Sequence, residues 1–134
     1  MGQLYAHVLK NSEKWIYPDL IIPIPLHPKK LKRREYNQSE SIANGMASVL
    51  LLPVVGDNLI RIENTETQTK KSRFGRYENL KDAFVYRDPH NLINKHILIV
   101  DDVVTTGATL EACSILILEL ENVRISIATI AFAE

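Results

Sequence analysis

The sequence has one cysteine, no net charge and no long apolar run, and each shortage excludes a class of protein. Cys113 cannot form an internal disulfide or supply a cysteine-rich zinc site. Sixteen basic residues balance sixteen acidic ones, so no overall positive charge attracts nucleic acid or an anionic membrane. The apolar runs are far shorter than the roughly 20 residues that span a bilayer. We therefore expect a soluble protein of a reducing compartment, the cytoplasm, without a membrane partner.

The chain is long enough and apolar enough to build one ordinary core. Its 134 residues are 46% hydrophobic, which predicts a single domain over residues 1–134. A weakly amphipathic helical segment within residues 1–18 precedes a core of residues 19–134. The four histidines lack the spacing of metal ligands, so we expect them on the surface or in structural roles.

Two segments in the first half of the chain predict strands. "DLIIPIP", residues 19–25, is a run of apolar and β-branched residues. Pro23 has no backbone N–H to donate, which argues against a central strand that is fully paired along both edges. "VVGDNLIRI", residues 54–62, indicates either a second strand or a broken pair of strands.

The residues between these two segments predict a helix. Apolar side chains recur at helical spacing within residues 37–52, and Pro53 marks the end of the helix. Asn37 and Ser39 are the candidate N-caps, because both side chains accept hydrogen bonds from first-turn N–H groups.

The last third of the chain has the most regular pattern. "HILIV", residues 96–100, predicts a buried strand, and residues 123–132 predict another. Between them, residues 107–120 have an apolar stripe of helical period, on which Cys113 is a core residue. Strand, loop, helix and strand recur at least twice. This order predicts an α/β fold, an open and mostly parallel twisted sheet flanked by helices, with ligands at the carboxyl ends of its strands.

The stretch "ILIVDDVVTTGATL", residues 97–110, places acids, hydroxyls and a glycine directly after a buried strand. Gly107 lets the backbone bend close to a ligand, and the orphan N–H groups and dipole of the next helix favour an anion. We therefore predict a phosphate cradle in the turn of residues 105–109. Asp101 and Asp102 would repel that phosphate, so we expect them to face ribose hydroxyls or a Mg²⁺ ion.

A simpler interpretation of this stretch is that Thr106 or Thr109 only caps the helix and that both acids are solvated. A cap needs one side chain, whereas the stretch offers three threonines and two acids. The stretch also lacks the lysine of a Walker A loop and the glycine pattern of a dinucleotide-binding turn. The cradle interpretation accounts for more of these residues.

Two basic stretches are further candidates for anion binding. Dense positive charge within residues 27–36 suits a diphosphate or a nucleic-acid backbone, or is a solvated turn. The members of this stretch are Lys29, Lys30, Lys32, Arg33 and Arg34. Polar residues 63–82 carry Lys71, Arg73 and Arg76 and form either a mobile lid over a substrate or a disordered surface loop.

"ILIVDDVVTTGATL" resembles the phosphoribosyl-pyrophosphate (PRPP) signature of the type I phosphoribosyltransferases. "IPIPLHPKKLKRREYNQSE" and "RIENTETQTKKSRFGRYENLKDAF" extend the resemblance to the ComF family, over roughly residues 19–134. The resemblance implies that Asp101 and Asp102 bind the ribose 2′- and 3′-hydroxyls, as catalytic residues that also face Mg²⁺. Residues 25–34 then correspond to the pyrophosphate loop. The residues implied to hold the 5′-phosphate are Thr105, Thr106, Gly107, Ala108 and Thr109.

The reaction implied by the resemblance is a displacement at the anomeric carbon of PRPP. Pyrophosphate leaves while Mg²⁺ and basic groups neutralise its charge, and a nitrogen nucleophile attacks the opposite face of the ribose. Asp101 and Asp102 are also expected to stabilise positive charge on the ribose. The residues do not identify the acceptor, a base or an amine. A homodimer is the default expectation for an oligomer.

The sequence departs from the ComF pattern at its start, and alternatives to catalysis stay open. Family members commonly carry an N-terminal, cysteine-rich, zinc-binding segment, and this sequence, which opens with "MGQLYAHVLK", has none. A shortened chain and a variant without that segment both fit. The family is named for DNA uptake in natural transformation, so a non-catalytic accessory protein of the DNA-uptake machinery is one alternative. A PRPP-sensing regulator is another, because a fold does not determine a function.

Overall fold

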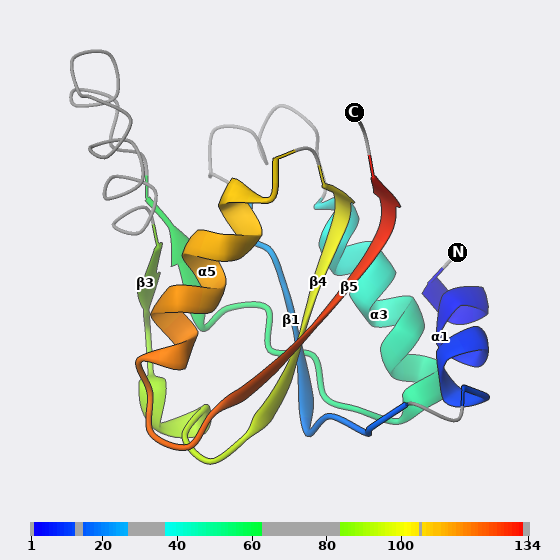
Figure 1. Cartoon of the computed structure of the whole chain (residues 1–134), viewed down its shortest axis with the longest axis horizontal. Coiled ribbons are helices and arrows are strands. Elements are labelled where there is room, and N and C mark those ends of the chain that lie inside the picture. The colour runs from blue at the N-terminus through cyan, green and yellow to red at the C-terminus, as the bar shows by residue number, and fades with distance from the viewer. Residues whose placement is uncertain (1, 13–14, 27–36, 63–83, 105, 133–134) are drawn as a thin grey trace.

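The computed structural model describes residues 2–12, 15–26, 37–62, 84–104 and 106–132 (Figure 1). Among these residues no helix has the length and apolar character needed to cross a membrane. The division of the chain into a short N-terminal segment and a core stays a prediction. In chain order the elements are α1 (Gly2–Lys10), β1 (Leu20–Pro23), α3 (Gln38–Leu50), β2 (Leu59–Arg61), β3 (Phe84–Tyr86), the 3₁₀ turn η1 (Pro89–Asn91), β4 (His96–Val104), α5 (Ala108–Leu118) and β5 (Arg124–Phe132).

Three parallel strands form the main sheet, in the order β1, β4, β5. Leu20 of β1 pairs with Ile97 of β4, and Val100 of β4 pairs with Ala128 of β5. Strands β2 and β3 form a separate antiparallel pair. Helices α1 and α3 lie on one side of the main sheet and α5 lies on the other (Figure 1). The predicted class is confirmed: the fold is α/β, with an open, mostly parallel sheet flanked by helices.

Strand β4, the middle strand of the sheet, is covered on both faces. Ile97 and Ile99 pack in one cluster with residues of α5, whereas Leu98 and Val100 pack in another with residues of α1 and α3. All four side chains are at most 1% exposed. Successive side chains of a strand point to opposite faces, so a strand covered on both faces is a continuous apolar run. Cys113 of α5 is buried in the first cluster, as predicted.

Strand β1 is paired fully along only one edge within the described part of the chain. Its second edge forms a single bridge, in which the N–H of Ile21 donates to Pro53 and the N–H of Val55 donates to Ile21. The expectation that Pro23 excludes full pairing along both edges is therefore confirmed. Residues 54–62 are a broken pair, because the chain bends between the bridge and β2.

Helix α3 begins at the predicted place but ends earlier than expected. Asn37 is its N-cap, and the side-chain oxygen of Asn37 accepts a hydrogen bond from the N–H of Ser39 at 3.0 Å. Of the two candidate caps, Asn37 is therefore the correct one. The helix ends before Leu51, which adopts a left-handed conformation with φ 57°. Pro53 follows two residues after this cap, where a proline cannot continue the helix.

Two strand features differ from the sequence expectations. Strand β4 continues beyond the predicted "HILIV" to Val104, because β5 pairs with it as far as Val104 and Phe132. Strand β3 was not predicted. It has three residues and is defined by its pairing with β2, in which Phe84 lies opposite Arg61. So short a strand has almost no alternating pattern of its own for sequence reasoning to find.

Candidate functional site

Asp101 and Asp102 lie among the last four residues of β4, at its carboxyl end. Oδ1 of Asp101 accepts hydrogen bonds from the Ser39 hydroxyl at 3.3 Å and from the Asp102 N–H at 2.9 Å. Oδ1 of Asp102 accepts from the Val103 N–H at 2.8 Å. Within the described chain, the Oδ1 atom of each acid therefore already accepts a hydrogen bond, and the two carboxyl groups also interact with each other through their side chains.

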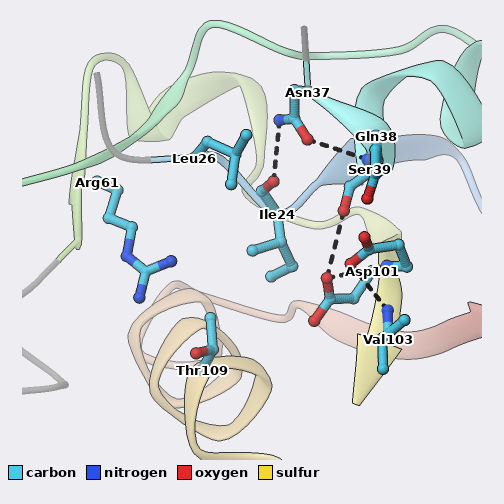
Figure 2. A pocket seen from close by; sticks show the side chains of 10 residues that line it. Ile24, Leu26, Asn37, Gln38, Ser39, Arg61, Asp101, Val103 and Thr109 are labelled. Atoms are coloured by element: carbon cyan, nitrogen blue, oxygen red, sulfur yellow. Dashed lines mark hydrogen bonds between the residues drawn. The ribbon is translucent and has the colours of Figure 1, made fainter. Parts of the chain in front are cut away.

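The start of α3 is fastened to the end of β1 next to these acids (Figure 2). The side-chain amide of Asn37 caps α3 with its oxygen, and its nitrogen donates to the carbonyl oxygen of Ile24 at 3.1 Å. This double contact brings Ser39, which is only 4% exposed, against Asp101. One asparagine thus aligns the ends of two strands and the start of a helix.

The turn between β4 and α5 has the conformation that the glycine was expected to provide. Gly107 adopts φ 80°, and a Cβ added there would have no heavy atom within 4 Å. The N-cap position of α5 is this glycine, which offers no side chain to satisfy the first-turn N–H groups. The Thr106 hydroxyl accepts one of them, from Ala108 at 3.2 Å. A partly exposed helix start with open space beside its glycine is a suitable place for an anion.

Two adjacent hollows meet at Asp101. The smaller one, about 40 Å³, is lined by the turn of residues 106–109. The larger one, about 160 Å³, is lined by the start of α3, Arg61 and both acids (Figure 2). Asp101, Val103 and Thr109 line both hollows. A ligand with groups of different chemistry therefore has space on both sides of the Asp101 carboxyl.

Burial and a neighbouring acid raise the pKa of Asp101 above its ordinary value. Desolvation by burial is the largest cause, and the adjacent Asp102 carboxylate acts in the same direction. The N–H of Asp102 and the Ser39 hydroxyl oppose the increase in pKa, because both donate to the ionised carboxylate. A cation, or a ligand that donates hydrogen bonds, would also favour the ionised form.

Arg61 belongs to the larger hollow and was missed by the sequence analysis. It is the last residue of β2, and its guanidinium lies 5.5 Å from the ring centroid of Phe84, its partner across the strand pair. Figure 2 shows Arg61 on the opposite side of the hollow from Ser39 and Asp101. Arg61 is the first residue of the stretch "RIENTETQTKKSRFGRYENLKDAF" that extends the resemblance to the ComF family, but the sequence analysis gave Arg61 itself no role. The pairing of β2 with the unpredicted β3 places it beside Phe84.

The acids fit a Mg²⁺ ion as partial ligands. Mg²⁺ is usually held by one or two carboxylates together with water and substrate phosphates, and Asp101 and Asp102 supply two adjacent carboxylates at the end of β4. In the described part of the chain no group of three or more acids, histidines or cysteines is placed to hold a metal ion. Any Mg²⁺ at these residues would therefore share its ligands with a substrate.

The structure brings together one group of predicted site residues and does not describe the other. Asp101, Asp102 and the turn of residues 106–109 meet at the two hollows. Sequence reasoning treated Ser39 only as a possible cap and gave no role to Arg61. The predicted residues that lie outside the described ranges are Lys29, Lys30, Lys32, Arg33, Arg34, Lys71, Arg73, Arg76 and Thr105.

An α/β sheet with a glycine turn and paired acids at its carboxyl end defines the class of phosphoribosyltransferase folds. The phosphoribosyl transferase domain family matches residues 37–134, so the chain belongs to this family. A purine phosphoribosyltransferase from Pyrococcus horikoshii has the same fold. Its TM-score is 0.57 at 22% identity, over 96% of this chain and 68% of that one.

Curated relatives refine this assignment. The chain is 34% identical over 112 residues to competence protein F of Haemophilus influenzae, covering 83% of this chain and 49% of that protein. It is 37% identical over 101 residues to DNA utilization protein YhgH of Salmonella typhi, covering 75% of this chain and 44% of that protein. The resemblance to the ComF family is confirmed. The chain spans about half the length of the curated relatives it matches.

Proposed function

We propose that this domain is a phosphoribosyltransferase, which binds PRPP with Mg²⁺ and transfers the phosphoribosyl group to a nitrogen acceptor. The meeting of the two hollows at Asp101 is the observation that supports this proposal. A phosphate in the smaller hollow would put its sugar beside the two carboxylates, and a second charged group would extend into the larger hollow. PRPP has its groups in this order: phosphate, ribose and diphosphate.

Each part of the site has a role in the proposed reaction. The turn of residues 105–109 donates hydrogen bonds to the 5′-phosphate, using N–H groups and threonine hydroxyls. Asp101 and Asp102 accept hydrogen bonds from the ribose hydroxyls. As the bond from the anomeric carbon to pyrophosphate breaks and the bond to nitrogen forms, their negative charge stabilises the positive ribose.

Charge neutralisation at the leaving pyrophosphate is the second requirement. Mg²⁺, when bound, neutralises the charge that develops on pyrophosphate, and Asp101 and Asp102 would hold it directly or through water. In this proposal two sets of basic side chains add further positive charge. They are Lys29, Lys30, Lys32, Arg33 and Arg34 in the pyrophosphate loop, and Lys71, Arg73 and Arg76 in the segment that follows β2.

Calorimetric titration with PRPP, with and without Mg²⁺, tests the proposal. We expect metal-dependent binding that the Asp101→Asn/Asp102→Asn double variant loses. Asp57→Asn is the matched control, because it removes an exposed carboxylate of a loop that lines neither hollow. No binding at millimolar PRPP by the unaltered protein would contradict the proposal. Binding followed by release of pyrophosphate when candidate bases are added would identify the acceptor.

The names of the curated relatives favour a second candidate, a non-catalytic role in DNA uptake or use. In this alternative the basic stretch of residues 29–34 would contact the nucleic-acid backbone. Reversing its charge should abolish DNA binding under this alternative, whereas under the first proposal it should lower the affinity for pyrophosphate. PRPP binding without turnover with any acceptor would instead favour a PRPP-sensing regulator.

A further inference from the structure

Arg61 lies over the aromatic ring of its partner across the β2–β3 strand pair. Its partner across the pair, Phe84, is 2% exposed, and the guanidinium lies 5.5 Å from the centroid of that ring. A cation over an aromatic face is attracted by the negative charge of the ring. Arg61 therefore lines the larger hollow as an anchored side chain, and Phe84 limits the directions in which its guanidinium can point.

The positive charge of Arg61 is not neutralised within the described part of the chain. Arg61 is partly buried and lines the same hollow as Asp101 and Asp102, yet it forms no ion pair with any described carboxylate. Removing a cation from water without a partner is costly. An anion that enters the hollow would supply a partner that the described residues do not, since Asp101 lies on the opposite side of the hollow (Figure 2).

The two hollows determine which anion this would be. The smaller hollow is lined by the phosphate cradle and does not include Arg61. The larger hollow includes Arg61 and excludes Thr106, Gly107 and Ala108. Asp101, expected at the ribose, lies on the boundary between them. If the 5′-phosphate occupies the smaller hollow and the ribose lies at Asp101, the ligand group beside Arg61 is the one attached to the opposite end of the ribose, at its anomeric carbon.

We infer that Arg61 binds the diphosphate of PRPP and the pyrophosphate that leaves, and so selects a 1-diphosphorylated sugar phosphate over a sugar phosphate. This inference rests on the proposed function. A guanidinium presents a planar fork of N–H donors that matches two phosphate oxygens at once. A lysine would keep the charge without this fork, so it is not an equivalent replacement.

Three probes separate the ends of the substrate: inorganic pyrophosphate, ribose 5-phosphate and PRPP, each titrated with Mg²⁺. We expect Arg61→Gln to weaken pyrophosphate and PRPP binding at least about tenfold, the scale of a lost charged hydrogen bond. Ribose 5-phosphate binding should stay within about twofold. Arg61→Lys should recover only part of the loss. Arg87→Gln, which removes an exposed arginine just after β3, should bind all three probes normally.

The outcomes distinguish the inference from the proposed function. If the unaltered protein binds none of the probes, the proposed function fails and the inference fails with it. If the unaltered protein binds them and Arg61→Gln leaves pyrophosphate affinity unchanged, only the inference is overturned. An equal loss for ribose 5-phosphate would assign Arg61 to the 5′-phosphate and also overturn it. Thermal unfolding of each variant confirms folding, and Phe84→Leu, which keeps an apolar side chain under Arg61, should weaken pyrophosphate binding less than Arg61→Gln.

Discussion

Ser39 and Asp101, which are 62 residues apart in the sequence, are joined by a hydrogen bond of 3.3 Å from hydroxyl to carboxylate. The bond connects the first turn of α3 with the carboxyl end of β4, so it links two elements that line the larger hollow. Because Asn37 fastens the same helix start to β1, the orientation of the Asp101 carboxyl depends on contacts from three elements.

Replacing Ser39 by alanine should lower stability and alter Asp101. The free energy of unfolding should fall by about 0.5–1.5 kcal/mol, the contribution of one hydrogen bond. The pKa of Asp101 should rise further, because the Ser39 hydroxyl favours the ionised carboxylate. Denaturant unfolding and a carboxyl NMR titration measure the two effects. Ser41→Ala, at an exposed position of the same turn, is the control, and equal effects in both variants would contradict this role.

The raised pKa of Asp101 predicts how stability depends on pH. The Asp101 carboxyl binds its proton more tightly in the folded protein than in the unfolded chain, where its pKa has the ordinary value of 3.8. Asp101 therefore contributes most to the free energy of unfolding below pH 3.8. This contribution is lost as the pH rises through the raised pKa of the folded state.

Asp101→Asn should consequently raise the melting temperature at neutral pH and have little effect below pH 3.8. The asparagine keeps an oxygen for Ser39 and Asp102, while the buried negative charge is removed. Thermal unfolding of both proteins across the acid range measures the difference. Asp57→Asn, which removes an exposed carboxylate of a loop, is the control. A lower melting temperature of Asp101→Asn at every pH would mean that the carboxylate is stabilising, contrary to this prediction.

The parts of the fold that were predictable are those with a strong local pattern. The apolar run before Asp101 is continuous because two helical layers cover β4, and the following helix and strand carry equally regular patterns. These segments sufficed to predict the parallel sheet and the acids at its edge. Strand β3 escaped prediction because its three residues are defined by pairing with β2 and not by their own sequence.

The site residues that sequence reasoning missed are those that arrive through tertiary contacts. Ser39 is an ordinary helix-start residue until packing brings it to Asp101, and Arg61 is an ordinary strand residue until Phe84 lies beneath it. The glycine turn was predictable for the opposite reason. The turn needs a positive φ at Gly107, and a residue without a side chain adopts a positive φ readily.

Gly107 provides the sharpest test of the phosphate cradle. Gly107→Ala should lower stability by about 1–2 kcal/mol, because φ 80° is strained for a residue with a Cβ. Gly107→Asn should lose much less stability, since asparagine tolerates the left-handed region.

Both variants put a Cβ into the open space of the turn, so both should weaken ribose 5-phosphate binding to a similar extent. Gly56→Ala, at a loop glycine without positive φ, is the control for both measurements. If Gly107→Asn bound ribose 5-phosphate as well as the unaltered protein, close approach of a phosphate to this backbone would be excluded, and the cradle would have to lie elsewhere.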